Sequence, residues 1–315
     1  MGFIIKFIYD LVQNYGLAII LFTIVIKLIL MPLNFRSQKA MRKQQKIQPY
    51  IAELQEKYKN DQQKLQQEMM KVYKENNVSM MGGCLPMLLQ FPILIGLYQV
   101  IQRPLQYMLG VVWENAYDEI CHLYNGAASI SQTLIGNITN ISENALNVWN
   151  QNQIMISKWA SAVGTSGTTL EGVTGNVHPW VIDFNFLGLD LSTIPGDAFQ
   201  HAVNNGAWMG LIIFIIPVLA VVSSIVSMKI TQAQSGQNKN TQANQMSKTM
   251  NIMMPAMTGF FTLILPAGLG LYWIISSLIQ IAQQLSINYY LEKKGDNADV
   301  IIPEKKNLHG KKRKK

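Results

Sequence analysis

Residues 250–287, MNIMMPAMTGFFTLILPAGLGLYWIISSLIQIAQQLSI, decide the fold. A helix needs about 20 apolar residues to cross a bilayer core of about 30 Å, so this stretch is too long for one span. Pro266-Ala267-Gly268 interrupts it, and proline and glycine are typical of a turn. We therefore predict two spans, 250–265 and 267–287, joined as a helical hairpin. The first reaches only about 24 Å, which implies local thinning of the bilayer.

Three further apolar stretches precede this hairpin, and together they predict five membrane spans. They cover residues 17–33, 84–102 and 208–228, of which the last is the clearest. Residues 1–16 are apolar but interrupted by Lys6 and Asp10, and Phe3, Phe7 and Leu11 suit a helix lying in the membrane interface. The alternative is a degenerate signal peptide, but no small-residue cleavage site follows.

The composition agrees with a membrane protein that has sizeable water-exposed loops. Charged residues make up 14% of the 315 residues and hydrophobic ones 49%, whereas soluble domains carry roughly a quarter charged residues. A collagen, a disordered chain and a disulfide-stapled secreted domain are excluded. The two cysteines, Cys84 and Cys121, are too few for a disulfide framework.

The basic residues predict the orientation. Residues 34–83 hold ten Lys and Arg, residues 229–249 hold three, and the tail from 288 holds nine, whereas residues 103–207 hold two against eight acidic residues. Because basic loops stay in the cytoplasm, we predict that 34–83, 229–249 and the tail 288–315 are cytoplasmic. The 103–207 segment is then an external loop or insertion, with the N-terminus outside and the C-terminus inside.

Lys27 is the one charged residue within the five predicted spans. A lysine at the centre of a membrane helix costs about 2.5–3.5 kcal/mol on the gentler insertion scale. One interpretation is snorkelling of the side chain to the interface. The other is a hydrated groove, since each span also carries a polar face and no span offers an acidic partner. The candidate groove residues are Thr23, Lys27, Asn34, Gln90, Trp273, Ser277, Gln280 and Gln284.

The sequence of the predicted cytoplasmic segment, 34–83, indicates an antiparallel helical hairpin. Its apolar residues recur at helical spacing, Ile47, Ile51, Leu54 and Tyr58 before Asn60-Asp61 and Leu65, Met69 and Val72 after it. A solvated charged face or a docking surface both fit the polar residues between them. The basic C-terminal run fits RNA or anionic lipid, or a plain topology signal. The candidate docking residues are Arg42, Lys43, Lys46, Lys311, Lys312, Arg313, Lys314 and Lys315.

The external segment 103–207 is rich in Asn, Ser, Gly and Thr. Residues 113–158 have room for one or two amphipathic helices, and residues 161–176 are typical of a flexible linker. Neither this segment nor the rest of the sequence shows metal-ligand spacing, a phosphate-binding glycine loop or a catalytic pair. We therefore predict no cofactor, no metal and no enzymatic activity.

Several of these segments together resemble the YidC/Oxa/Alb family of membrane protein insertases. The matching strings are TIVIKLILMPL at 23–33, GGCLPMLLQFPILIGLY at 82–98, FLGLDL at 186–191, and MMPAMTGFF, LPAGLGLYW and IQIAQQ within 253–284. The resemblance touches all five spans and leaves out most of 103–180. It is nearest to the short type of Gram-positive bacteria, although no lipoprotein cysteine stands near the N-terminus.

The resemblance implies an all-α polytopic insertase core in a bacterial cell membrane. In that family a basic residue of the first span, usually Arg, faces a hydrophilic groove, and Lys27 is similar in position. Thr23 and Trp273 match family substrate-contact positions, and Ser277 stands where Asn is common. The implied partners are nascent membrane proteins, the ribosome, the signal-recognition machinery, the lipid bilayer and, in some cases, the Sec translocon, but not DNA.

The competing hypothesis is a small-solute or anion transporter or channel with Lys27 as its anion site. Such a protein would show inverted repeats or broken helices in matched halves. The five predicted spans with one long hairpin loop do not have that pattern.

Overall fold

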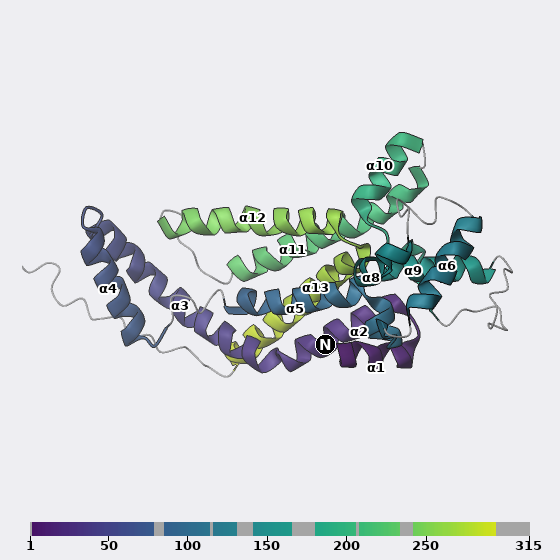
Figure 1. The fold of residues 1–315 in the computed structure, drawn as a ribbon. Helices are drawn as coiled ribbons and strands as arrows, with labels where there is room; N and C mark the ends of the chain where they lie inside the picture. Colours follow the sequence, from purple (N-terminus) through teal and green to yellow (C-terminus); the bar gives the residue numbers. More distant parts are fainter. Residues whose placement is uncertain are drawn as a thin grey trace, which may run out of the picture. The chain divides into compact units, whose positions relative to one another are not determined.

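The computed structural model describes residues 2–78, 85–113, 116–130, 141–165, 180–205, 208–233 and 242–293, and these are mostly helical (Figure 1). A single antiparallel ribbon, β1 with β2, is the only sheet among them. The elements are α1 Gly2–Val12, α2 Tyr15–Ile29, α3 Met31–Lys57, α4 Gln62–Glu75, α5 Leu85–Gln102, η1 Leu105–Leu109, α6 Tyr117–Ile130, α8 Ile141–Gln151, α9 Gln153–Thr165, β1 Asn185–Phe186, β2 Leu189–Asp190, α10 Pro195–Asn205, η3 Trp208–Phe214, α11 Ile215–Ala233, α12 Gln242–Ile264 and α13 Ala267–Lys293.

The chain divides into two compact units, and several helices contribute to both. The first unit comprises Met1–Ile26, Phe91–Val221 and Thr258–Ser276. The second comprises Lys27–Gln90, Val222–Met257 and Ser277–Lys315. The described elements are helices apart from β1 and β2, which confirms the predicted all-α fold at the level of secondary structure.

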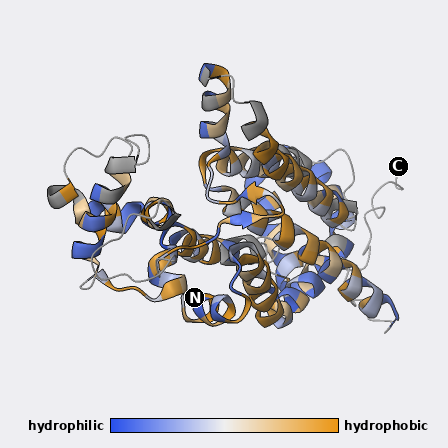
Figure 2. Cartoon of the chain, turned by 90° about the vertical axis from the view of Figure 1, so that its right-hand side faces the viewer, coloured by the Kyte–Doolittle hydropathy of each residue, from blue (hydrophilic) through white to orange (hydrophobic). Residues whose placement is uncertain are grey.

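One described helix, Leu211–Thr231, is long and apolar enough by itself to cross a membrane. Tyr15–Ile29 and Met31–Gln44 meet the same criterion together, as a pair bent by 58°, and Met253–Ile264 is a shorter apolar helix. In Figure 2 some helices are mostly orange, whereas others mix blue and orange along their length. The predicted span 267–287 lies within α13, and the predicted span 84–102 coincides with α5 from Leu85 onward, since residue 84 lies outside the described residues.

The first predicted span, 17–33, differs from the structure at its end. The helix α2 stops at Ile29, and Pro32 belongs to the first turn of α3. Proline has no N–H and its ring clashes with the preceding turn, so it is favoured in the first turn of a helix and is unfavourable in the interior. The chain therefore turns by 58° at Leu30, and α3 begins three residues before the predicted start of the hairpin.

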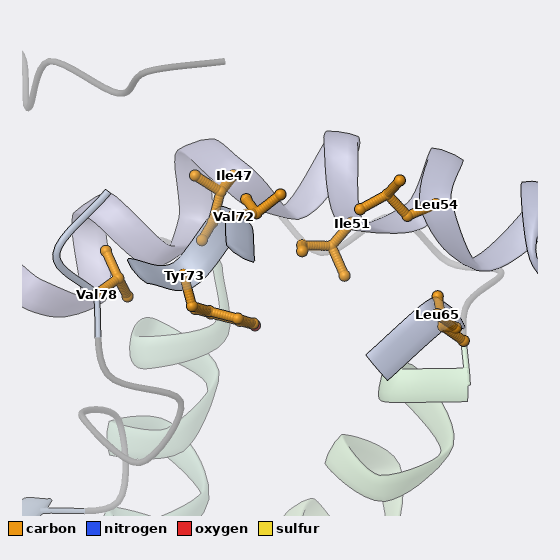
Figure 3. Packing of buried hydrophobic residues seen from close by; sticks show 7 residues of the cluster. All are labelled: Ile47, Ile51, Leu54, Leu65, Val72, Tyr73 and Val78. Atoms are coloured by element: carbon orange, nitrogen blue, oxygen red, sulfur yellow. The ribbon is translucent and has the colours of Figure 1, made fainter. Parts of the chain in front are cut away.

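Helices α3 and α4 form a helical hairpin around a small apolar core. Asp61 caps α4, since its carboxylate accepts a hydrogen bond from the Lys64 N–H at 3.0 Å. Figure 3 shows the α3 side chains directed toward those of α4. The buried core comprises Ile47, Ile51, Leu54, Leu65, Val72, Tyr73 and Val78, with Tyr50, Tyr58 and Met69 packed against it.

We expect Ile51→Ala to loosen this hairpin while the rest of the chain stays folded. Ile51 is 2% exposed, and truncating a buried isoleucine to alanine costs about 2–5 kcal/mol. Amide hydrogen exchange within α4 should therefore accelerate by more than tenfold. Met70→Ala, on the exposed face of α4, is the control, and equal exchange in the two variants would contradict the packing argument.

The predicted external segment contains a compact helical bundle made of α6, α8 and α9. Trp159 is fully buried, and its ring meets that of Tyr124 edge-on at 5.7 Å. Trp149 lies between Trp113 and Trp180, with ring centroids 6.3 and 6.2 Å away. The described residues of 113–165 thus form three helices where one or two were predicted. Residues 161–165 belong to α9 rather than to the predicted linker, and 166–176 lie outside the described residues.

The β1–β2 ribbon places its following loop against the first turn of α13. The N–H groups of Ala267 and Gly268 donate to the carbonyls of Thr193 and Leu191 at 2.9 and 2.8 Å. A helix leaves its first N–H groups without partners inside the helix. The loop therefore supplies the acceptors that the start of α13 requires.

Candidate functional site: a buried lysine beside a helix break

Lys27 lies in the last turn of α2, close to the break at Leu30. Its side chain is only 7% exposed. The ion pairs between described residues are Lys6–Asp10, Arg42–Glu292 and Lys158–Asp190, so none of them includes Lys27. A buried cation is stable only when water, a polar group or an opposite charge solvates it, which makes Lys27 the centre of the candidate site.

Gln283 of α13 connects the two sides of the helix break. Its Nε2 donates to the backbone carbonyl of Lys27 at 3.1 Å, and its Oε1 accepts from Asn34 Nδ2 at 3.2 Å. The last carbonyls of α2 lack partners within the helix, so the amide of Gln283 satisfies one of them. This bridge fixes the backbone that carries Lys27.

Within the second unit, polar contacts also join α13 to α11 and to α3. Gln284, which is 5% exposed, accepts from Thr231 Oγ1 of α11 at 3.0 Å. The guanidinium of Arg42 donates to the carbonyl of Asn288 at 2.9 Å and to its side-chain oxygen at 3.2 Å, and lies 3.4 Å from Glu292. Buried polar side chains on neighbouring membrane helices commonly pair in this way.

The structure brings together some of the candidate groove residues. Lys27 and Asn34 share Gln283 as a partner, although the bend at Leu30 places them on different helices. Gln284 is buried on α13, Gln280 is exposed, and Ser277 and Gln90 are half-buried.

Thr23 and Trp273 belong to the other compact unit. Thr23 is fully buried, and its hydroxyl donates to the Ile19 carbonyl one turn earlier at 2.7 Å. Trp273 stacks on Phe261 with ring centroids 6.3 Å apart and planes 13° apart. In this structure the hydroxyl of Thr23 is therefore engaged by its own helix.

The candidate docking residues have different surroundings. Arg42 is engaged by α13, Lys43 is half-buried and Lys46 is exposed. The candidate docking residues 311–315 lie outside the described residues. In the part of the chain that the structure describes, no group of three or more His, Cys, Asp or Glu is placed to hold a metal ion.

Three residues of this site, Gln283, Thr231 and Asn288, are not among the residues predicted from the sequence. Gln283 directly precedes the predicted Gln284, and Ser276 and Gln283, seven residues apart, share one helix face and are 5% and 9% exposed. That spacing was available in the sequence. The candidate groove residues on α13 are Trp273, Ser277, Gln280 and Gln284, whose spacings of 4, 3 and 4 do not include Gln283.

We expect Gln283→Leu to widen the range of separations between α3 and α13, because Gln283 of α13 bonds to Asn34 of α3. Leucine keeps most of the volume but removes both hydrogen bonds, which leaves the Lys27 carbonyl and the Asn34 amide without this partner. Spin labels at Arg36 and Ser286, both exposed, should then report a broader distance distribution by pulsed electron paramagnetic resonance. Gln280→Leu is the matched control, and an unchanged distribution in Gln283→Leu would exclude the bridging role.

These features define a helical membrane protein with a lysine that is buried near the end of a broken helix and has no ion-pair partner among the described residues. The chain belongs to the 60Kd inner membrane protein family, the YidC/Oxa/Alb family, whose model matches residues 7–294. The expected family resemblance is therefore confirmed.

Some relatives match most of the chain, and others match about a third of it. The membrane protein insertase YidC of Clostridium perfringens (strain 13 / Type A) is 31% identical over 303 residues, which is 95% of this chain and 84% of that protein. That of Clostridium tetani is 53% identical over 102 residues, 31% of this chain and 46% of that protein. That of Pelodictyon phaeoclathratiforme is 30% identical over 277 residues, 88% of this chain and 33% of that protein.

Proposed function

We infer that the protein is a membrane protein insertase, which moves segments of newly made proteins from the cytoplasm into the lipid bilayer. The family match over residues 7–294 supports this function. The observation that carries the mechanism is Lys27, a cation 7% exposed and outside every described ion pair.

The topology that accompanies this function has five spans, at 17–33, 84–102, 208–228, 250–265 and 267–287, with the hairpin and the tail in the cytoplasm. The basic residues of 34–83, 229–249 and 288–315 support this orientation. The N-terminal helix α1 then lies in the outer interface. Its Phe3, Phe7 and Leu11 are 85%, 62% and 74% exposed, which suits contact with lipid.

The mechanism uses Lys27 as a transient counter-charge within a hydrophilic groove. Acidic groups in the short external segment of a substrate are attracted to the ammonium, and this offsets part of the cost of removing them from water. The apolar span of the substrate then moves sideways into lipid, where burial of its surface drives the step. The buried polar side chain of Gln283, which donates to the Lys27 carbonyl, is consistent with such a groove.

The α3–α4 hairpin and the basic tail are the proposed docking sites for the ribosome, the signal-recognition machinery and, for some substrates, the Sec translocon. The exposed Lys46 and Lys71 of the hairpin support electrostatic docking to an acidic partner. The tail adds five consecutive basic residues, 311–315. Anionic lipid or RNA has the charge to attract such a run.

Reconstitution tests this function against transport of a small anion. Purified protein in liposomes should insert a single-span substrate, detected as a protease-protected fragment, without added nucleotide. The same liposomes should show no protein-dependent release of a trapped small anion. Anion release without insertion would instead support the channel or transporter hypothesis.

A further inference from the structure

The helical bundle of α6, α8 and α9 is tied to the loop around the β1–β2 ribbon by two polar contacts. The hydroxyl of Ser157, on α9, accepts a hydrogen bond from the Ile182 N–H at 2.9 Å, and Ser157 is 1% exposed. The next residue, Lys158, pairs with Asp190 of β2 at 3.1 Å. Adjacent residues of α9 therefore hold both the start and the end of segment 182–190.

Asp190 connects this bundle to the loop that follows the ribbon. Oδ2 of Asp190 accepts a hydrogen bond from Lys158 Nζ. Its Oδ1 accepts from both the N–H and the hydroxyl of Ser192. Burial raises the pKa of Asp190, but the hydrogen bonds from Ser192 and the charge of Lys158 outweigh it, so the pKa lies below the ordinary value of 3.8. The carboxyl is thus ionised under physiological conditions, and its contacts are charge-assisted.

The same loop contacts the ends of two membrane helices. The carbonyls of Leu191 and Thr193 accept from the first N–H groups of α13. The ring of Phe184 meets that of Tyr15, at the start of α2, edge-on at 4.9 Å. Gly16 packs directly against the ring of Phe186, where a Cβ would overlap it.

These contacts run without a break from α9 to the first turns of α2 and α13. A helix start inside or near a bilayer has little water to satisfy its N–H groups, so the supplied carbonyls strongly constrain where it sits. The loop that supplies them is constrained in turn by Asp190, and Asp190 by Lys158. Movement of α9 would therefore shift the turn at 265–268 and the start of α2.

We propose that the α6/α8/α9 bundle positions the outer ends of α2 and α13, with Ser157, Lys158 and Asp190 as its positioning residues. This role rests on the proposed insertase function, because α2 carries Lys27 and α13 carries Gln283. The bundle then fixes the outer end of the substrate path through the loop at 182–193, without itself touching the substrate.

Amide hydrogen exchange at the start of α13 tests the positioning directly. In the full-length protein in lipid nanodiscs, Asp190→Asn and Lys158→Met should each accelerate exchange of Ala267 and Gly268 by about two- to fivefold, the factor expected for losing an ion pair whose side chains are 45% and 38% exposed. Lys158→Arg, which keeps the charge, should leave exchange near the wild-type rate. Asp10→Asn, which removes the exposed Lys6–Asp10 pair, is the control and should have no effect.

Insertion by the same variants provides the second measurement. Asp190→Asn and Lys158→Met should lower the insertion rate several-fold, and Lys158→Arg should restore it. Unchanged exchange at Ala267 and Gly268, or equal loss of protection in Asp10→Asn, would overturn the proposal. If the variants accelerate exchange as expected but the wild-type protein itself inserts nothing, the positioning role holds and the insertase function fails.

Discussion

Lys27→Ala is expected to reduce insertion of substrates with acidic external segments by more than a hundredfold. Two opposite charges 4 Å apart attract by about 4 kcal/mol at an effective dielectric constant of 20, and every 1.4 kcal/mol is tenfold. Lys27→Glu should abolish insertion, because a carboxylate repels the same substrates. Lys27→Arg should preserve it, since the charge is kept. The measurement is the protease-protected fraction of substrate in proteoliposomes.

The control for Lys27 is a second lysine on a membrane helix. Lys229, on α11, is exposed, so Lys229→Ala should leave insertion within about twofold of wild type. A substrate whose external segment lacks acidic residues separates electrostatics from folding, because Lys27→Ala should slow it far less. Full activity of Lys27→Ala on several acidic substrates would refute the counter-charge mechanism.

The helical class and the core of the hairpin were predictable because both follow from local periodicity. Ile47, Ile51 and Leu54 recur at helical spacing, and these same residues are buried between α3 and α4. A narrow apolar stripe on an otherwise polar helix has one stable solution, which is to pack against another such stripe. The partner stripe, through Leu65 and Val72, lies directly after the turn.

The surroundings of Lys27 were less predictable because they depend on contacts between distant segments. Pro32 lies in the first turn of α3, beyond the break at Leu30, so Asn34 lies on a different helix from Thr23 and Lys27. Gln283 becomes the bridging residue because the break frees the Lys27 carbonyl. A repeat along one helix cannot specify which face of α13 meets that carbonyl.

The α6/α8/α9 bundle illustrates a second limit. Residues 113–165 are polar enough to resemble a loop, yet Trp149, Trp159 and Trp180 lie 8% exposed or less. A few large aromatic rings bury as much surface as many small apolar residues. A composition average hides this contribution, whereas the positions of the rings on α8 and α9 reveal it.

Gly270→Leu is expected to prevent folding of the first unit, and Gly270→Ala to destabilise it by about 1–3 kcal/mol, the usual cost of overpacking. Gly270 lies on α13, where an added Cβ would overlap Cγ2 of Ile216 on α11. Ile216 is 4% exposed, so it has little room to move. Small residues allow membrane helices to approach closely. The measurement is thermal unfolding of the detergent-solubilised protein.

Removing the overlapping methyl group distinguishes this clash from a general effect of substitution on α13. Ile216→Ala alone creates a cavity and lowers stability, but adding Gly270→Ala to it should cost little more, because the new methyl group fills part of that space. The two changes are thus expected to be strongly non-additive. Leu278→Ala, at an exposed position of α13, should be nearly neutral. A double variant destabilised by the sum of the two single effects would show that Gly270 and Ile216 do not limit the approach of α13 to α11.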